Sequence, residues 1–150
     1  MVDEQEYITL TKDELKRRFD IYNKQYFWGK LDKCRFYITG VNNSDYGSYT
    51  PQRDSKGNLY SIIRIGRCVR WTDETLRLIL VHEMIHMYVR TIEGVRIDGV
   101  LGHGRHFRKH CRRLLKDYGL KIEVHPKFEY INKKLFPKMW ERVILWLIDR

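Results

Sequence analysis

Apolar positions recur at helical spacing in three segments of the chain. The first begins with Thr11-Lys12-Asp13-Glu14, which has the order of a capping box, and ends before Gly29. The second is predicted over 73–91, with Thr72 as its N-cap and an apolar pattern typical of a buried helix. The third is predicted over 104–118 and ends at Gly119. These segments predict three helices that share one core.

Strand character appears between the first two helices. The segments 35–39, 46–50 and 59–65 are rich in aromatic and β-branched residues and are separated by turn residues at 42–43 and 54–58. This pattern predicts a small antiparallel sheet packed with helices, which is an α+β fold. Its strands either only cover the helices, or include an edge strand that aligns an extended substrate by backbone pairing.

The whole chain, residues 1–150, is expected to form a single domain. A length of 150 residues with 43% hydrophobic content suffices for one core, and no repeat or linker divides it. We expect the core at about 10–126 and a helical extension at about 127–150. One side of that extension is apolar, either packed on the core or exposed to a partner, at Met139, Trp140, Val143, Ile144 and Leu147.

Composition favours a monomeric protein of the cytoplasm, without membrane association. The acidic amino terminus lacks the order of a secretory signal, and the longest apolar run is too short to span a membrane. The cysteines, Cys34, Cys68 and Cys111, are odd in number and widely spaced, which argues against a disulfide framework and against a Cys-x-x-Cys zinc ribbon. We expect all three to be reduced and buried.

The motif His82-Glu83-Met84-Ile85-His86 lies within the second predicted helix. Residues four apart share a helix face, so both imidazoles can bind one Zn²⁺ ion while Glu83 reaches its water. This is the geometry of a zinc metallopeptidase. The alternative is a pair of core histidines bonded to carbonyl groups, with Glu83 paired to an arginine.

A catalytic zinc site needs a third protein ligand, because three ligands leave the fourth position open. Four downstream residues qualify by type: Glu93, His103, His106 and His110. Glu93 is more typical of a helix end before Gly94. Spacing alone does not choose among the three histidines.

The chain resembles the SprT-like family, the zinc peptidase domain that also forms the catalytic part of Spartan proteins. The resemblance rests on 19–27 with Gly29-Lys30-Leu31, on 80–86, and on His103-Gly104-Arg105-His106-Phe107, and covers about 10–126. It implies a zincin-like fold with the metal motif on a central helix. It also implies His103 as the third zinc ligand and Glu83 as the general base. His106 and His110 would then be solvated, face DNA or assist substrate binding.

Basic residues are concentrated on the polar face of the third predicted helix. The net charge is +10 and the pI about 9.6, so a polyanionic partner fits. The candidate DNA-phosphate contacts are Arg105, Arg108, Lys109, Arg112, Arg113 and Lys116.

The sequence therefore predicts a zinc-dependent endopeptidase that acts on protein or peptide substrates. By resemblance to Spartan proteins, the extended prediction is DNA-stimulated cleavage of DNA-bound or crosslinked proteins, a DNA-repair role. Two alternatives stay open. One is a DNA-binding module with a structural zinc and little proteolytic activity, and the other is a general intracellular peptidase without a nucleic-acid role.

Overall fold

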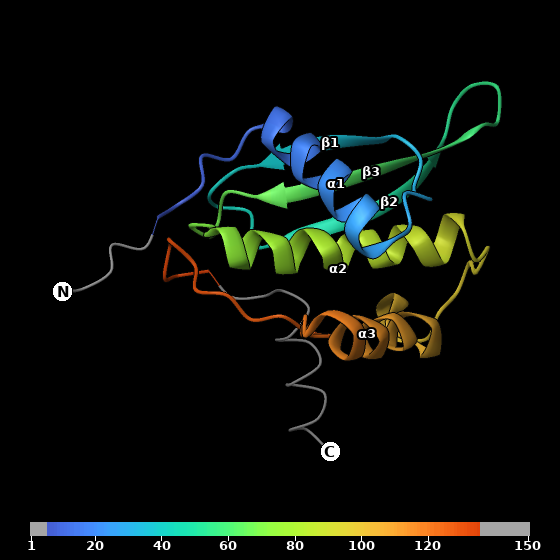
Figure 1. Ribbon diagram of the computed structural model, residues 1–150. Helices are drawn as coiled ribbons and strands as arrows, with labels where there is room; N and C mark the ends of the chain where they lie inside the picture. Colours follow the sequence, from blue (N-terminus) through green and yellow to red (C-terminus); the bar gives the residue numbers. More distant parts are fainter. Residues whose placement is uncertain (1–5, 136–150) are drawn as a thin grey trace, which may run out of the picture.

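The computed structural model describes residues 6–135, and these form a three-stranded sheet with three α-helices (Figure 1). The elements follow in the order α1 (Lys12–Tyr26), β1 (Cys34–Thr39), β2 (Gly47–Arg53), β3 (Leu59–Gly66), α2 (Asp73–Thr91), a 3₁₀ turn η1 (Val100–Gly102) and α3 (Arg105–Tyr118). The predicted α+β class is confirmed. Of the helical extension expected at about 127–150, residues 136–150 lie outside the described residues.

The sheet is mixed, with the strand order β1-β3-β2. β2 pairs antiparallel with β3, but β1 pairs parallel with β3, so the prediction of a purely antiparallel sheet is wrong for that pair. The chain reverses between β1 and β2 and again between β2 and β3, so β1 and β3 run in the same direction. Because β3 lies in the middle, the two parallel strands become neighbours and β2 is left as an edge strand.

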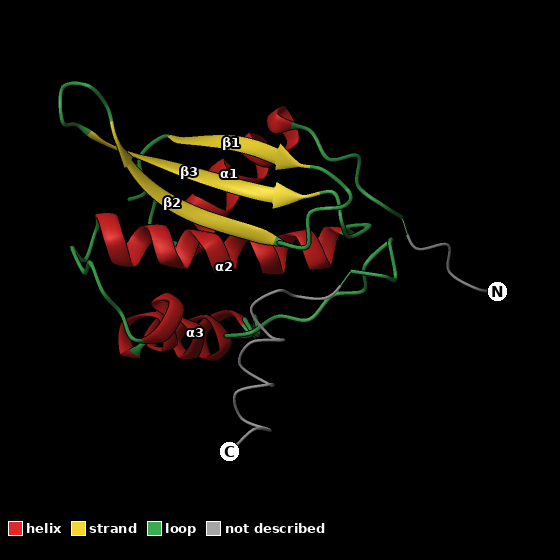
Figure 2. Cartoon of the chain, turned by 180° about the vertical axis from the view of Figure 1, so that it is seen from behind, coloured by secondary structure: helices red, strands yellow, loops and turns green. Residues whose placement is uncertain are grey.

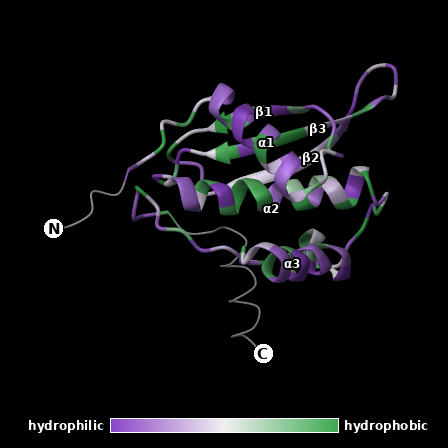
Figure 3. Ribbon diagram, in the orientation of Figure 1, coloured by the Kyte–Doolittle hydropathy of each residue, from purple (hydrophilic) through white to green (hydrophobic). Residues whose placement is uncertain are grey.

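Helices α1 and α2 pack against one face of the sheet, and α2 lies between the sheet and α3 (Figures 1 and 2). Phe19 of α1 meets Phe36 of β1 edge to face, with ring centroids 5.5 Å apart. A Cβ at Gly47 would stand 3.1 Å from Cγ1 of Ile79, so this glycine allows β2 to approach α2 closely. In Figure 3, hydrophobic residues alternate with hydrophilic ones along α2, whereas α3 is mostly hydrophilic.

Helix boundaries agree with the capping residues in the sequence. Thr72 caps α2 in a reciprocal box with Thr75, and Thr11 accepts a hydrogen bond from the Glu14 amide at the start of α1. The Glu14 carboxylate binds Arg17 and Arg18 instead of completing a box. Helix α3 ends as predicted, with Gly119 in the left-handed conformation.

An irregular segment, 120–135, runs from the end of α3 back to the residues that precede α2. Phe128 and Tyr130 fix it: the Tyr46 hydroxyl donates to the Phe128 carbonyl at 2.9 Å, and the Tyr130 hydroxyl donates to the Ser44 carbonyl at 2.6 Å. These bonds tie the segment to the loop between β1 and β2. Within residues 6–135, no helix is long and apolar enough to cross a membrane.

The three cysteines are all free, as predicted. Cys68 is buried, whereas Cys34 and Cys111 are half-buried. Burial raises the pKa of Cys34 to about 12 and those of Cys68 and Cys111 to about 11. The thiols therefore stay protonated at neutral pH and unreactive.

Candidate metal centre

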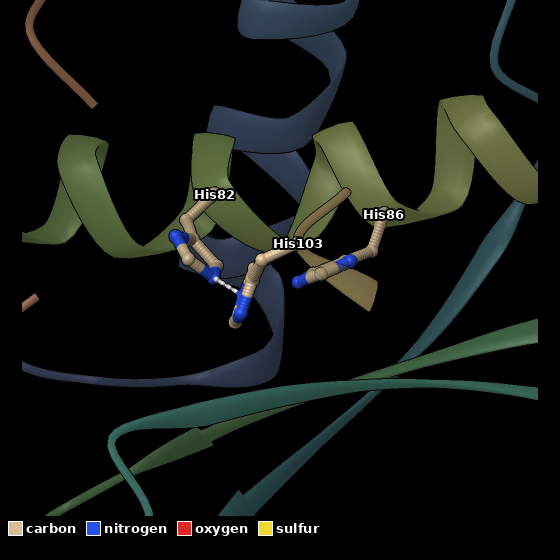
Figure 4. A group of neighbouring side chains, drawn as sticks. All are labelled: His82, His86 and His103. Carbon is tan, nitrogen blue, oxygen red and sulfur yellow. Dashed lines mark hydrogen bonds between the residues drawn. The ribbon is translucent and has the colours of Figure 1, made fainter. Parts of the chain in front are cut away.

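Three histidines from two parts of the fold converge beside α2. His82 and His86 lie four residues apart on that helix, and His103 comes from the loop before α3. One nitrogen from each ring lies within 4.8 Å of the other two, and Nε2 of His82 is 3.2 Å from Nε2 of His103 (Figure 4). Such a three-histidine group can hold a metal ion.

A backbone carbonyl orients the His82 ring. Nδ1 of His82 lies 3.0 Å from the Glu123 carbonyl oxygen, which can only accept, so Nδ1 carries the proton. In the neutral ring Nε2 then keeps its lone pair, and this is the atom that faces His103. Metal-binding histidines in proteins are commonly oriented in this way by a second hydrogen bond.

The three rings are held in their neutral form. Burial, followed by the nearby charge of His86 and His103, lowers the pKa of His82 well below its usual range. Burial and neighbouring histidines also lower the pKa of His86 and of His103 to about 4. Neutral imidazole is the form that binds metal, so no proton has to be displaced at neutral pH.

Phe107 forms an apolar floor under the three rings. It is fully buried, and its ring centroid lies 4.8 Å from that of His82, 4.5 Å from His86 and 4.8 Å from His103. A packed aromatic ring restricts the rotamers of all three histidines and keeps water away from one side of the group.

The loop that carries His103 depends on two glycines and one aspartate. A Cβ at Gly102 (φ +72°) would stand 3.1 Å from the His86 ring, and one at Gly104 would stand 2.4 Å from Oδ1 of Asp98. The buried Asp98 carboxylate accepts from the amides of His106 (3.2 Å) and Phe107 (2.7 Å) in the first turn of α3. Asp98 thus caps α3 from outside the helix and closes the loop around His103.

Glu83 is buried and lines the same cleft as the three histidines. The cleft has a volume of about 380 Å³ and runs between α2, the edge strand β2 and the loop before α3. Burial, with a smaller contribution from the negative charge of Asp45, raises the pKa of Glu83 to about 8. Among residues 6–135 Glu83 has no arginine partner, so the alternative of a structural ion pair has no support there.

The sequence matches the SprT-like family over residues 15–134, which includes the sheet, the motif helix and the His103 loop. The chain belongs to the SprT-like family. A comparison with curated proteins gives no match. Family membership and the three-histidine group together indicate a metallopeptidase-type domain.

The other third-ligand candidates of this SprT-like domain lie elsewhere. His106 is half-buried and its Nδ1 contacts the Asp98 carboxylate at 3.0 Å. His110 is buried and bonds through Nε2 to Glu93, whose other oxygen accepts from Lys109 at 3.0 Å. The Glu93 contacts join α3 to the segment just after α2. The structure therefore brings His103, and none of these three, to the motif histidines.

The predicted DNA-contact residues divide into two groups by their surroundings. Arg105, Arg108, Lys109, Arg112 and Lys116 are exposed on α3. Arg113 is half-buried: its guanidinium donates to Nδ1 of His110 and to the Tyr26 carbonyl, and lies 4.5 Å over the Trp28 ring. Arg113 therefore joins α3 to the end of α1. Arg108 also donates to the His103 carbonyl at 3.0 Å.

Sequence reasoning missed three contributors to the site. Asp98 gave no periodic signal, although an aspartate before a glycine-rich loop and a helix is a recognisable cap donor. Glu123 acts through its backbone carbonyl, which no side-chain pattern can reveal. His125 lies in the irregular segment after α3, and its ring centroid is 5.2 Å from that of His103.

Proposed function

We propose that this SprT-like domain is a zinc-dependent endopeptidase, with His82, His86 and His103 as the ligands of one Zn²⁺ ion and Glu83 as the general base. The observation that carries the proposal is the convergence of three neutral imidazoles beside a buried carboxyl group in one open cleft. Zinc fits this donor set because three nitrogen ligands are typical of catalytic zinc and leave a position for water.

Bound zinc would lower the pKa of a water molecule toward neutrality and polarise the scissile carbonyl group. Glu83 would take the proton from that water and return it to the leaving amine nitrogen. Burial raises the pKa of Glu83 to about 8 in the metal-free protein, so its ionised form is a stronger base than an exposed carboxylate, and a nearby dication favours that ionised form.

The edge strand β2 supports an extended peptide as the substrate. Tyr46 accepts from the Gly66 amide and the Asp54 amide donates to Asn58, so the even-numbered residues of this strand bond to β3. The backbone groups of Gly47 and Tyr49 therefore point to the open side, and both residues line the cleft. Pro51, which has no amide proton, ends the pairing surface.

Glu83→Gln tests the proposal against a DNA-binding module with a structural zinc. We expect peptide cleavage to fall by at least about 10²-fold, because the general base is lost while the shape of the side chain is kept. The matched control is Glu74→Gln, the same change at an exposed position of α2. Wild-type protein that binds zinc but cleaves no peptide would favour the rival function.

Elemental analysis tests the ligand set independently of activity. Protein purified without a histidine tag should carry one zinc per chain, and His82→Ala or His103→Ala should lose it. His106→Ala is the control that keeps the metal, because His106 bonds to Asp98 instead. Zinc retained by His103→Ala would contradict the three-histidine site.

DNA-stimulated action is the extension of this proposal. It is supported by exposed Arg105, Arg112 and Lys116, which are seven and four residues apart and so form one stripe along α3. The stripe begins two residues after His103, so DNA bound there would lie close to the cleft. A bound protein substrate would then be held near the metal centre.

A further inference from the structure

Two arginines line the cleft beyond the metal centre. Arg90 is half-buried in the last turn of α2, and Arg96 is exposed in the loop that follows. Neither forms a hydrogen bond or an ion pair with any of the residues 6–135. A half-buried guanidinium without a partner is unusual, because desolvating a charge is unfavourable unless the charge is paired.

The neighbouring carboxylates, Asp98 and Glu93, form no ion pair with either arginine. Both oxygens of Asp98 accept from the first turn of α3, and both oxygens of Glu93 are bonded to His110 and Lys109. Asp98 keeps its negative charge in the cleft, but among residues 6–135 no carboxylate pairs with Arg90 or Arg96. An anionic group of a substrate can pair with such guanidinium groups.

We propose that Arg90 and Arg96 form a subsite for an acidic side chain of the protein substrate. Arg90 follows His86 by four residues, so it lies on the same face of α2, about 6 Å farther along the helix. A peptide extended along β2 advances about 3.3 Å per residue. The aspartate or glutamate is therefore held about two residues from the scissile bond.

This inference rests on the proposed function and adds a preference to it. A guanidinium binds a carboxylate through two parallel hydrogen bonds, so the subsite prefers acidic over neutral residues and rejects lysine. The cleft is bounded by β2, whose free backbone groups can pair with a peptide, and this suits the side chain of a paired peptide better than the backbone of a nucleic acid.

The test begins with a neutral, end-blocked peptide whose cleaved bond is identified. Glutamate, glutamine and lysine are then placed in turn at each of the three positions on either side of that bond. At one position two residues from the bond, we expect glutamate to raise kcat/KM roughly 10-fold over glutamine. Arg90→Gln should remove this difference, and Arg90→Lys should keep part of it.

Arg70→Gln is the matched control, because Arg70 is exposed and lies against Tyr7, outside the cleft. It should leave the glutamate preference unchanged. The proposal is overturned by equal rates for glutamate and glutamine at all positions, or by a preference that survives Arg90→Gln. It is also overturned if only a free carboxyl terminus is recognised, which unblocked peptides of the same series measure.

A binding measurement separates this inference from the proposed function. On zinc-loaded Glu83→Gln protein, fluorescence anisotropy should give tighter binding of the glutamate peptide than of the glutamine peptide. The difference in affinity between the two peptides should disappear when Arg90→Gln is added. This outcome supports the subsite even if no peptide is cleaved, whereas equal binding overturns it.

Discussion

His82 illustrates how single atoms prepare the metal centre. Its Nδ1 is committed to the Glu123 carbonyl, its Nε2 faces His103, and Phe107 packs against its ring. The first contact fixes the tautomer, the second fixes the direction of the Nε2 lone pair, and the third restricts the rotamer. A ligand that is already oriented loses little conformational entropy when it binds a metal.

Zinc affinity should be insensitive to pH down to about pH 5. Ordinary histidines take up protons near pH 6.5 and then lose the lone pair that binds metal. In this protein His86 and His103 have a pKa of about 4 and that of His82 is also lowered, so protons compete with zinc only as the pH falls toward 4. Competitive titration of Glu83→Gln protein with a zinc-sensitive dye between pH 4.5 and 8 measures this.

A different pH dependence of zinc affinity would contradict this prediction. A steep loss of affinity that begins at about pH 6.5 would mean that the histidines titrate like exposed ones. A designed peptide with three exposed histidines gives the reference curve for that behaviour. The Glu83→Gln background keeps the titration of this carboxyl group out of the measurement.

At the scale of elements, the site depends on how α3 begins. The N-cap residue of α3 is Gly104, which has no side chain to cap the helix, and Asp98 supplies the acceptor from the preceding loop. The same bonds close the turn that contains His103. The start of α3 and the position of the third histidine are therefore one structural feature.

Asp98→Ala should weaken both stability and zinc binding. It leaves the amides of His106 and Phe107 without their acceptor, which costs about 1 to 3 kcal/mol of unfolding free energy. His103 should also become less well placed, so zinc affinity falls. Urea unfolding of the metal-free protein and a zinc titration measure the two effects.

Asp117→Ala is the matched control on the same helix. Asp117 is exposed near the end of α3, so its loss should change stability by less than about 0.5 kcal/mol and leave zinc affinity as it is. Unchanged zinc affinity in Asp98→Ala would show that His103 is placed without help from the cap.

The helices could be predicted from the sequence, whereas the connections between elements could not. α2 matches its predicted bounds of 73–91, and the Thr72 cap is confirmed, because periodicity and capping are local properties. The parallel pairing of β1 with β3 depends on which strand occupies the middle of the sheet, a tertiary choice. The convergence of His103 with α2 likewise required the resemblance to SprT-like proteins, since spacing left three histidines equivalent.

Charge is the property that belongs to the whole molecule. The chain carries a net charge of +10, but several of its cations are committed to contacts inside the fold: Arg18 to Glu14 and Asp73, and Arg113 to the end of α1. Exposed basic side chains without such contacts are available to bind partners. The position of these side chains relative to the cleft decides whether a bound polyanion stimulates catalysis or only binds.

Replacing Arg105, Arg112 and Lys116 with glutamine should weaken DNA binding and remove any stimulation of cleavage by DNA. Phosphate contacts release about 0.9 counterions each from duplex DNA, so the slope of log K against log salt concentration should fall by up to about 3. Arg108 is kept, because it donates to the His103 carbonyl. Fluorescence anisotropy with duplex and single-stranded DNA at several salt concentrations measures the slope.

The control replaces three exposed lysines outside α3, Lys16, Lys33 and Lys56, with glutamine and lowers the net charge by the same three units. If binding depends on the α3 stripe, this control changes the slope little and leaves stimulation intact. Equal losses of DNA binding and of stimulation in both variants would mean that DNA binding depends on the overall charge alone. The rate of cleavage without DNA should be the same in both variants, since none of the six positions lines the cleft. A wild-type rate that DNA does not change would favour a general peptidase.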